Sequence, residues 1–245
     1  MKKNIFPIRG VILFLFLLFG NPFHGLSNVY GQTDTLPGIQ PLLELAGQSI
    51  QALLPASLRP LVDVKEMEAF LQELEGMPPD WTQLRHSDLT EQSKRLFQLN
   101  RQRDKTRMDQ HSLLHQPVAF LWSGTLRQFL PEYQGFSLAL GPERTPTSWG
   151  IIRFKPRELP DYLIAVPSPA LRHKLLARQQ AGEHIEIIVV FIGTLIPDES
   201  LIYAFSHDGH KEGMILPVVF VRNIMYILKA LRLSWRSDHD EAELK

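Results

Sequence analysis

The sequence predicts an α+β protein in which an N-terminal helical segment is followed by a small barrel of mixed or antiparallel strands with one capping helix. Two patterns along the 245 residues support this fold class. Up to about residue 114, apolar residues recur every three or four positions, which is typical of amphipathic helices. From Pro117 onward they alternate or form short β-branched runs, which is typical of strands.

Residues 1–31 have the layout of a secretory signal peptide. Lys2, Lys3 and Arg9 form a positive start, and residues 11–19 are an unbroken apolar run. Such a run fits the apolar core of a signal peptide and is shorter than the roughly 20 residues that span a bilayer. Small residues suit cleavage after Ser27 or after Gly31, so we expect a periplasmic or secreted protein. The open alternative is an uncleaved N-terminal segment that anchors the protein.

Composition narrows the classes of function. The chain has no cysteine, which excludes a lipoprotein anchor, disulfides, iron–sulfur clusters and a cysteine nucleophile. Outside the signal, no stretch is long and uncharged enough to span a membrane. Lys+Arg and Asp+Glu both number 26, and removal of the three basic signal residues leaves 23 against 26. A nucleic-acid partner is therefore not expected, because such proteins usually carry a basic domain.

Residues 32–62 are expected to be an irregular lead-in, because four prolines interrupt them: Pro37, Pro41, Pro55 and Pro60. A helical arm is expected over 63–116. Its first helix starts with Asp63 as N-cap and Glu66 in a capping box, and it ends at Gly76. A rigid turn with two prolines then leads to Trp81. A second helix is expected from about residue 88 or 90 to about 114.

The charge reverses between these two helices. Residues 62–91 carry eight acids against two bases, whereas residues 94–107 carry six bases against one acid. One interpretation is a basic patch for an anionic partner, formed by Arg101, Arg103, Lys105 and Arg107. The other is a solvated helix face that complements the acidic helix before it.

The barrel is expected over residues 117–228, followed by a polar tail at 229–245. Its strand candidates are 118–126, 135–140, 149–154, 162–166, 183–196, 201–205 and 216–228. Ser168 and Pro169 start the one helix of this half, which Gly182 ends. Gly-Thr-Leu occurs late in two strands, at 124–126 and 193–195, where we expect the strands to bend.

This order of elements resembles the OB-fold, a five-stranded, partly open Greek-key barrel with a helix between its third and fourth strands. The resemblance covers residues 117–228, with one strand candidate more than the fold needs before the helix. It implies a ligand surface formed by Tyr133, Trp149, Arg153, Lys155 and the loop 197–213. Trp149 could serve as a stacking platform. The alternative for Trp149 and Tyr133 is packing in the core.

The densest polar cluster is Ser206–His210. His207, Asp208 and His210 could contact a ligand or a divalent metal, but Asp208-Gly209 is also a favourable turn, and a metal site usually needs a third or fourth ligand. No nucleophile elbow, phosphate-binding glycine loop or dinucleotide fingerprint is present. We therefore expect no catalytic residue, no cofactor and no metal.

Three functions remain after these exclusions, of which the third is a structural, oligomer-forming envelope protein. The first is an exported, non-catalytic binding or adaptor protein of the cell envelope, whose partner is a protein or another envelope component. The alternative is a metal-dependent or hydrolytic enzyme that uses the loop 197–213. The sequence identifies neither the ligand nor the oligomeric state.

Overall fold

The structure is a computed structural model that describes residues 38–45, 47–108, 111–141, 143–206 and 212–229. All of them belong to the larger of two units of the chain, residues 35–245. The signal expected at 1–31 and nearly all of the tail expected at 229–245 lie outside the described residues. None of the described helices is long and apolar enough to cross a membrane.

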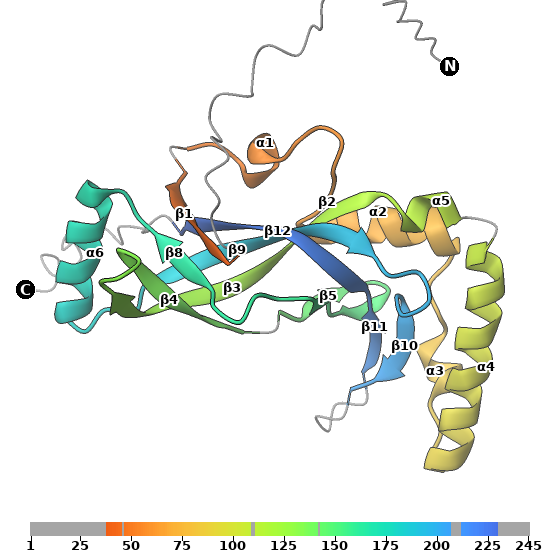
Figure 1. Cartoon of the computed structure of the whole chain (residues 1–245). Helices are drawn as coiled ribbons and strands as arrows, with labels where there is room; N and C mark the ends of the chain where they lie inside the picture. The colour runs from red at the N-terminus through yellow and green to blue at the C-terminus, as the bar shows by residue number, and fades with distance from the viewer. Residues whose placement is uncertain (1–37, 46, 109–110, 142, 207–211, 230–245) are drawn as a thin grey trace, which may run out of the picture. The chain divides into compact units, whose positions relative to one another are not determined.

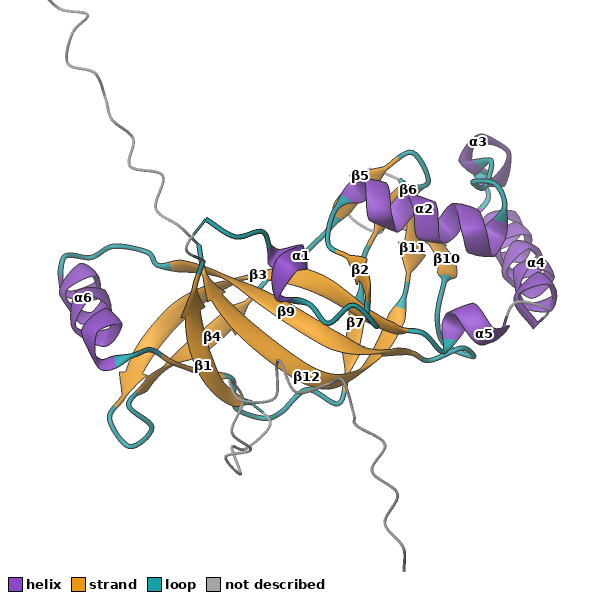
Figure 2. Cartoon of the chain, turned by 90° about the horizontal axis from the view of Figure 1, so that it is seen from above, coloured by secondary structure: helices purple, strands orange, loops and turns teal. Residues whose placement is uncertain are grey.

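Six strands close into a barrel (Figures 1 and 2). In order around the barrel they are β1 (Ile39–Glu44), β8 (Ile164–Val166), β4 (Gly135–Leu140), β3 (Pro117–Leu130), β9 (Glu186–Leu195) and β12 (Val218–Leu228), which pairs with β1 again. β1 is parallel to both of its neighbours, and the other pairs are antiparallel. A closed β-barrel in a mixed α/β chain is what the sequence predicts at this level, and six strands are compatible with an OB-like barrel.

Aromatic side chains fill the barrel interior. Phe120 on β3 is stacked between Phe191 and Phe154, with ring centroids 5.1 and 4.5 Å apart, and all three are buried. Tyr226 on β12 is fully buried, and its hydroxyl donates a hydrogen bond of 2.8 Å to the carbonyl of Gly38. This bond ties the end of β12 to the start of β1, so it holds the strand pair that closes the barrel.

A second apolar cluster lies on the other side of the barrel wall. Ala119, Val190 and Ile227, from β3, β9 and β12, are buried beneath the segment 45–54. This segment contains the short helix α1 (Ile50–Leu53), whose N-cap is Ser49. These strands carry apolar residues on both faces, and this segment covers the outer face, which would otherwise be exposed to solvent.

The described part of the expected lead-in, residues 38–45 and 47–62, is not irregular as its prolines suggest. They contribute β1 to the barrel and β2 (Arg59–Leu61), so the barrel begins before the helical arm rather than after it. Pro60 is tolerated because β2 is an edge strand that pairs only with β3. Pro41 lies where β1 stops pairing with β8 and begins to pair with β12.

A separate four-stranded sheet is formed by insertions between barrel strands. Its order is β10 (Ile202–Phe205), β11 (Gly213–Leu216), β6 (Gly150–Ile152) and β5 (Thr145–Thr147). The expected strand 149–154 therefore lies outside the barrel, which accounts for the surplus strand candidate. The expected strand 216–228 is β12 except at its start, where Leu216 ends β11 and Pro217, which has no N–H to donate, separates the two strands. β7 (Lys155–Arg157) pairs with β12.

The other described helices have the following bounds. α2 (Val64–Glu75) begins at the Asp63 cap and ends at Gly76, whose φ is 78°. α3 (Trp81–Leu84) follows the proline turn, and α4 (Leu89–Met108) and α5 (His111–Leu114) occupy the span of the second expected helix. α6 (Pro169–Gln180) begins at the Ser168 cap and lies between β8 and β9.

Gly193 permits a close approach of two barrel strands. It lies on β9 opposite Val221, next to the irregularity in the β9–β12 register between Val221 and Asn223. A Cβ atom at Gly193 would lie 2.1 Å from the carbonyl oxygen of Phe220. The second Gly-Thr-Leu therefore marks a place where neighbouring backbones come too close for a side chain.

We expect Gly193→Ala to lower the free energy of unfolding by about 1–3 kcal/mol, because the β12 backbone must move to accept the methyl group. Urea denaturation of the protein lacking residues 1–31 measures this change. Gly141→Ala is the matched control, since a Cβ atom there meets nothing within 4 Å. Equal destabilisation by the two substitutions would contradict the close approach.

Candidate functional site

Trp81 attaches the helical arm to the four-stranded sheet. Asp80 caps α3 by accepting from the backbone N–H groups of Thr82 and Gln83, which holds Trp81 at the first position of the helix. A Cβ atom at Gly213 would lie 1.9 Å from the indole ring, so this glycine leaves room for Trp81. The indole Nε1 donates a hydrogen bond of 2.7 Å to the carbonyl of Trp149.

The aromatic residues that the sequence offers as ligand contacts lie in different environments. Trp149 is 3% exposed and belongs to the core, because it lies in the turn between β5 and β6 of the four-stranded sheet, where its carbonyl accepts from Trp81. This agrees with core packing and leaves no free ring face for a ligand. Tyr133, in the turn between β3 and β4, is 40% exposed. Its part in ligand binding stays a prediction.

The OB resemblance implies that Arg153 and Lys155 lie on a barrel strand, but neither lies on one of the six strands of the barrel. Arg153 is half-buried between β6 and β7, and its backbone N–H donates to the carbonyl of Ile215 on β11. Lys155 is exposed at the start of β7. His207, Asp208 and His210 lie outside the described residues. In the part of the chain that the structure describes, no group of three or more His, Asp or Glu side chains is placed to hold a metal ion.

A buried charge cluster joins α2 to α4. It consists of Glu75, whose side chain is fully buried, with Arg103 and Arg107. One carboxylate oxygen of Glu75 accepts from Arg103 at 2.9 Å, and the other accepts from Arg107 at 2.7 Å. Each oxygen of the carboxylate thus has its own guanidinium, which is the hydrogen bonding that a buried charge requires.

The same face of α4 also covers the edge of β10. Asn100 donates to the carbonyl of Tyr203 at 3.0 Å and accepts from its N–H at 2.8 Å, as a neighbouring strand would. Arg107 donates to the carbonyls of Ser200 and Leu201, at 3.1 and 3.2 Å. The backbone groups of Tyr203 on this edge, and the carbonyls just before β10, are therefore satisfied within the chain and not available to another chain.

The basic run therefore divides between two sides of α4. Arg103 and Arg107 point inward and complement the acidic helix α2, which is the second interpretation of the charge reversal. Arg101 and Lys105 are exposed on the opposite side, where the anionic-partner interpretation still applies. The two pairs are offset by two residues, which places them about 200° apart around a helix of 3.6 residues per turn.

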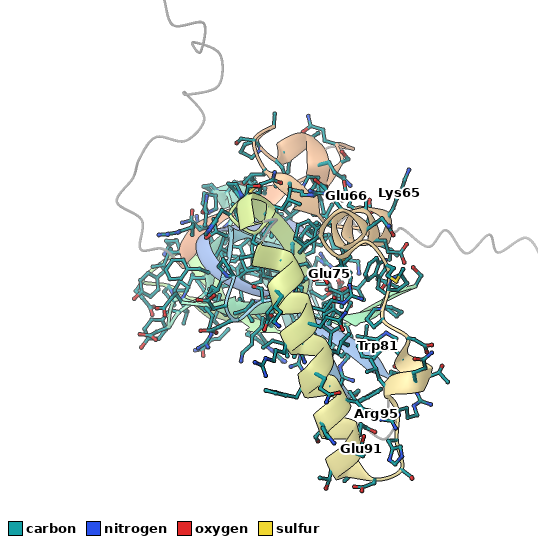
Figure 3. All side chains as sticks on the ribbon, turned by 90° about the vertical axis from the view of Figure 1, so that its right-hand side faces the viewer. Lys65, Glu66, Glu75, Trp81, Glu91 and Arg95 are labelled. Carbon is teal, nitrogen blue, oxygen red and sulfur yellow. The ribbon has the colours of Figure 1, made fainter. Side chains whose placement is uncertain are left out.

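Arg101 and Lys105 share their side of the helix with an exposed aromatic residue. Phe97 is 66% exposed, and Lys94, about two turns before Arg101, is also exposed although it lies 3.9 Å from Glu91. We call these four residues the outward face of α4: Lys94, Phe97, Arg101 and Lys105. Figure 3 views the molecule from the side on which α4 lies in front, with Glu75 beside its upper part.

Sequence reasoning misses two residues of this arrangement. Phe97 lies outside the apolar stripe of its helix, and a single aromatic in an otherwise polar helix is the signal that could have identified it. Glu75 follows Leu71 by one helical turn, so it extends the apolar stripe of α2 with an acid. An acid in that position before a basic helix could have indicated a buried ion pair.

No family model, curated protein or solved structure matches this chain.

We expect Glu75→Gln to lower the free energy of unfolding by about 3–5 kcal/mol, because Arg107, only 4% exposed, would lose its buried counter-ion and keep only Asp104, which is 67% exposed. Urea denaturation measures the loss. Glu73→Gln is the control: Glu73 pairs with Arg59 at 2.5 Å but is 48% exposed, so the change should cost less than about 1 kcal/mol. Similar losses for both variants would argue against a buried cluster.

Alkaline pH should destabilise the protein through Tyr203. Burial raises the pKa of Tyr203 above its ordinary 10.0, and the charge of Glu75 raises it further, while Arg103 and Arg107 oppose the shift. As the pH rises, the unfolded chain therefore loses the phenolic proton of Tyr203 before the folded chain does. The contribution of Tyr203 to the free energy of unfolding is complete below pH 10 and declines above it, by up to about 1.4 kcal/mol per pH unit. Tyr203→Phe should reduce this slope in urea unfolding above pH 10. Tyr162→Phe, at a position 73% exposed, should leave it unchanged.

Proposed function

We propose that this protein is an exported, non-catalytic binding or adaptor protein of the cell envelope, and that the outward face of α4 contacts an acidic protein partner. The observation that carries the proposal is Phe97, which is 66% exposed among three basic side chains on a helix whose opposite side is fully engaged. Export rests on the signal-like residues 1–31.

The chemistry of this face is that of an interface. Aromatic residues and arginine are enriched in protein–protein interfaces and dominate their binding energy. Burial of an exposed phenylalanine side chain stabilises a complex by roughly 1.5–3 kcal/mol. Lys94, Arg101 and Lys105 surround Phe97 with positive charge, which favours a partner that presents an apolar pocket inside an acidic surface.

The attachment of α4 favours binding without rearrangement. The buried charge cluster and the Asn100 contacts to β10 hold the inner side of the helix at several points along its length. A helix held in this way loses little conformational entropy when a partner binds, and affinity rises accordingly. The overall charge of the chain without residues 1–31 favours a protein over a nucleic acid as the partner.

The barrel supports a binding role as well. β3, β4, β8, β9 and β12, with α6 between the third and fourth of them, have the element order of an OB-fold, to which β1 adds a sixth strand. In that interpretation Tyr133 lies in the loop between the first two strands, which is one of the usual ligand loops. Most uses of the fold are binding rather than catalysis, so the barrel and α4 favour the same class of function.

The test compares variants of the outward face of α4 in capture from cell-envelope extract. Phe97→Ala, and separately the double variant Arg101→Glu/Lys105→Glu, should each weaken binding of the purified captured protein at least about tenfold. The loss arises from the missing aromatic contact in the first variant and from charge repulsion in the second. Binding of the unmodified protein should also weaken as salt increases.

Two control variants change similar groups elsewhere on the surface. Tyr162→Ala removes an aromatic ring that is 73% exposed, and Lys174→Glu reverses an exposed charge on α6. Neither variant should weaken binding of the captured protein. The proposal fails if the variants of α4 and the controls bind equally well, or if no protein is retained above an unrelated bait.

A further inference from the structure

The four-stranded sheet is apolar on both of its faces. Residues that are paired across β10, β11, β6 and β5 project from the same face of the sheet. On one face Tyr203, Ile215 and Ile152 are buried, and Trp81 of α3 covers Gly213. We call the opposite face the outer face of the sheet. Its six strand residues are all apolar: Pro146, Ile151, Ile202, Ala204, Met214 and Leu216.

The outer face is not part of the described core. Ile202 is 43% exposed, Pro146 is also exposed, and the other four residues are half-buried. Among the described residues, none of the six belongs to a buried apolar cluster or to the apolar side chains packed against one. A sheet with one solvent-exposed face usually alternates apolar and polar residues. This sheet does not, so its outer face has the composition of a contact surface.

One base and one acid lie at opposite ends of the outer face. Arg153 follows β6, and its N–H donates to the carbonyl of Ile215, so it lies level with Leu216 of β11. Glu212 precedes β11, and its carbonyl accepts from Ser206, which continues the register of β10 with β11. By strand alternation both residues project from the outer face. Arg153 is half-buried and Glu212 is exposed, and neither side chain forms a hydrogen bond or an ion pair within the described residues.

We propose that the outer face binds the same face of a second copy of this chain. The two sheets pack face to face with nearly aligned strands, related by a two-fold axis that lies between the sheets and runs perpendicular to the strands. This axis reverses one sheet end for end relative to the other, so Arg153 of each copy meets the partner's Glu212. The uncharged residues between these two contacts pack against each other. A second copy is favoured over an unlike protein because the charge pattern of the face is complementary to itself.

The size of the outer face determines the strength of this dimer. Four strands about 4.8 Å apart, with about four residues each at ~3.3 Å per residue, cover roughly 250 Å² in each copy. Standard stable interfaces bury about 800 Å² in each partner, so we expect a weak and reversible dimer with a Kd of about 0.1 mM. The dimer goes beyond the proposed function of the outward face of α4 and does not depend on it.

The first test is sedimentation equilibrium of the protein lacking residues 1–31, at concentrations from about 10 μM to about 1 mM. We expect the average mass to rise from that of the monomer towards that of the dimer. Ile202→Lys should weaken self-association at least about tenfold, because each copy would bury an ammonium group against an apolar sheet. Val64→Lys is the matched control, since Val64 lies on α2 and is 40% exposed. Both variants should keep the urea midpoint of the unmodified protein.

Charge reversal tests the two-fold arrangement itself. Arg153→Glu and Glu212→Arg should each weaken self-association at least about tenfold, because like charges then meet at both ends of the interface. An equimolar mixture of the two variants should form a mixed dimer about as tightly as the unmodified protein does, because an acid again meets a base at each end.

Three outcomes would overturn the proposal. The protein stays monomeric up to about 1 mM, Val64→Lys weakens self-association as much as Ile202→Lys, or the mixture of charge variants associates no more than each variant alone. Partner capture by the outward face of α4 is a separate measurement, so failure of the dimer leaves the proposed function untouched.

Discussion

The arrangement outside the barrel depends on the buried ion pairs of Glu75. This one carboxylate neutralises Arg103 and Arg107, which come from the helix that covers the edge of β10. A single acid between two guanidinium groups leaves one excess positive charge, which Arg107 shares with Asp104 and with two backbone carbonyls of the β10 end. The position of α4 is therefore set by electrostatics and hydrogen bonding more than by apolar packing, which explains how so polar a helix is held in a defined place.

The barrel, in contrast, is closed by strand pairing rather than by buried ion pairs. β1 closes it by parallel pairing on both sides, but its pairing shifts from β8 to β12 along six residues. The register of β12 with β9 also shifts, between Val221 and Asn223, next to the close approach at Gly193. On the side of β12 opposite β9, Arg222 and Asn223 lie between two pairings, because β7 pairs only with Val218–Phe220 and β1 only with Tyr226–Leu228.

Local signals predicted the individual elements well and their assembly less well. Asp63, Gly76 and Ser168 act within one turn of chain, so their capping roles could be recognised from sequence. The role of β1 could not, because Pro41 breaks a strand by local rules and is accommodated only where two distant pairings meet. For the same reason the sequence indicated that residues 94–107 are basic but not which of them face the acid on α2.

The division of the basic residues makes the outward face of α4 more specific than the basic run alone suggests. If all four predicted residues were exposed, the helix would be a diffuse cationic surface that attracts any polyanion. With Arg103 and Arg107 engaged by Glu75, the basic residues exposed on the side of Phe97 are Arg101, Lys105 and Lys94, and Lys94 also lies 3.9 Å from Glu91. An isolated ring needs a pocket of matching shape, and three surrounding charges need acids in matching positions. That combination favours one defined protein surface over non-specific anion binding.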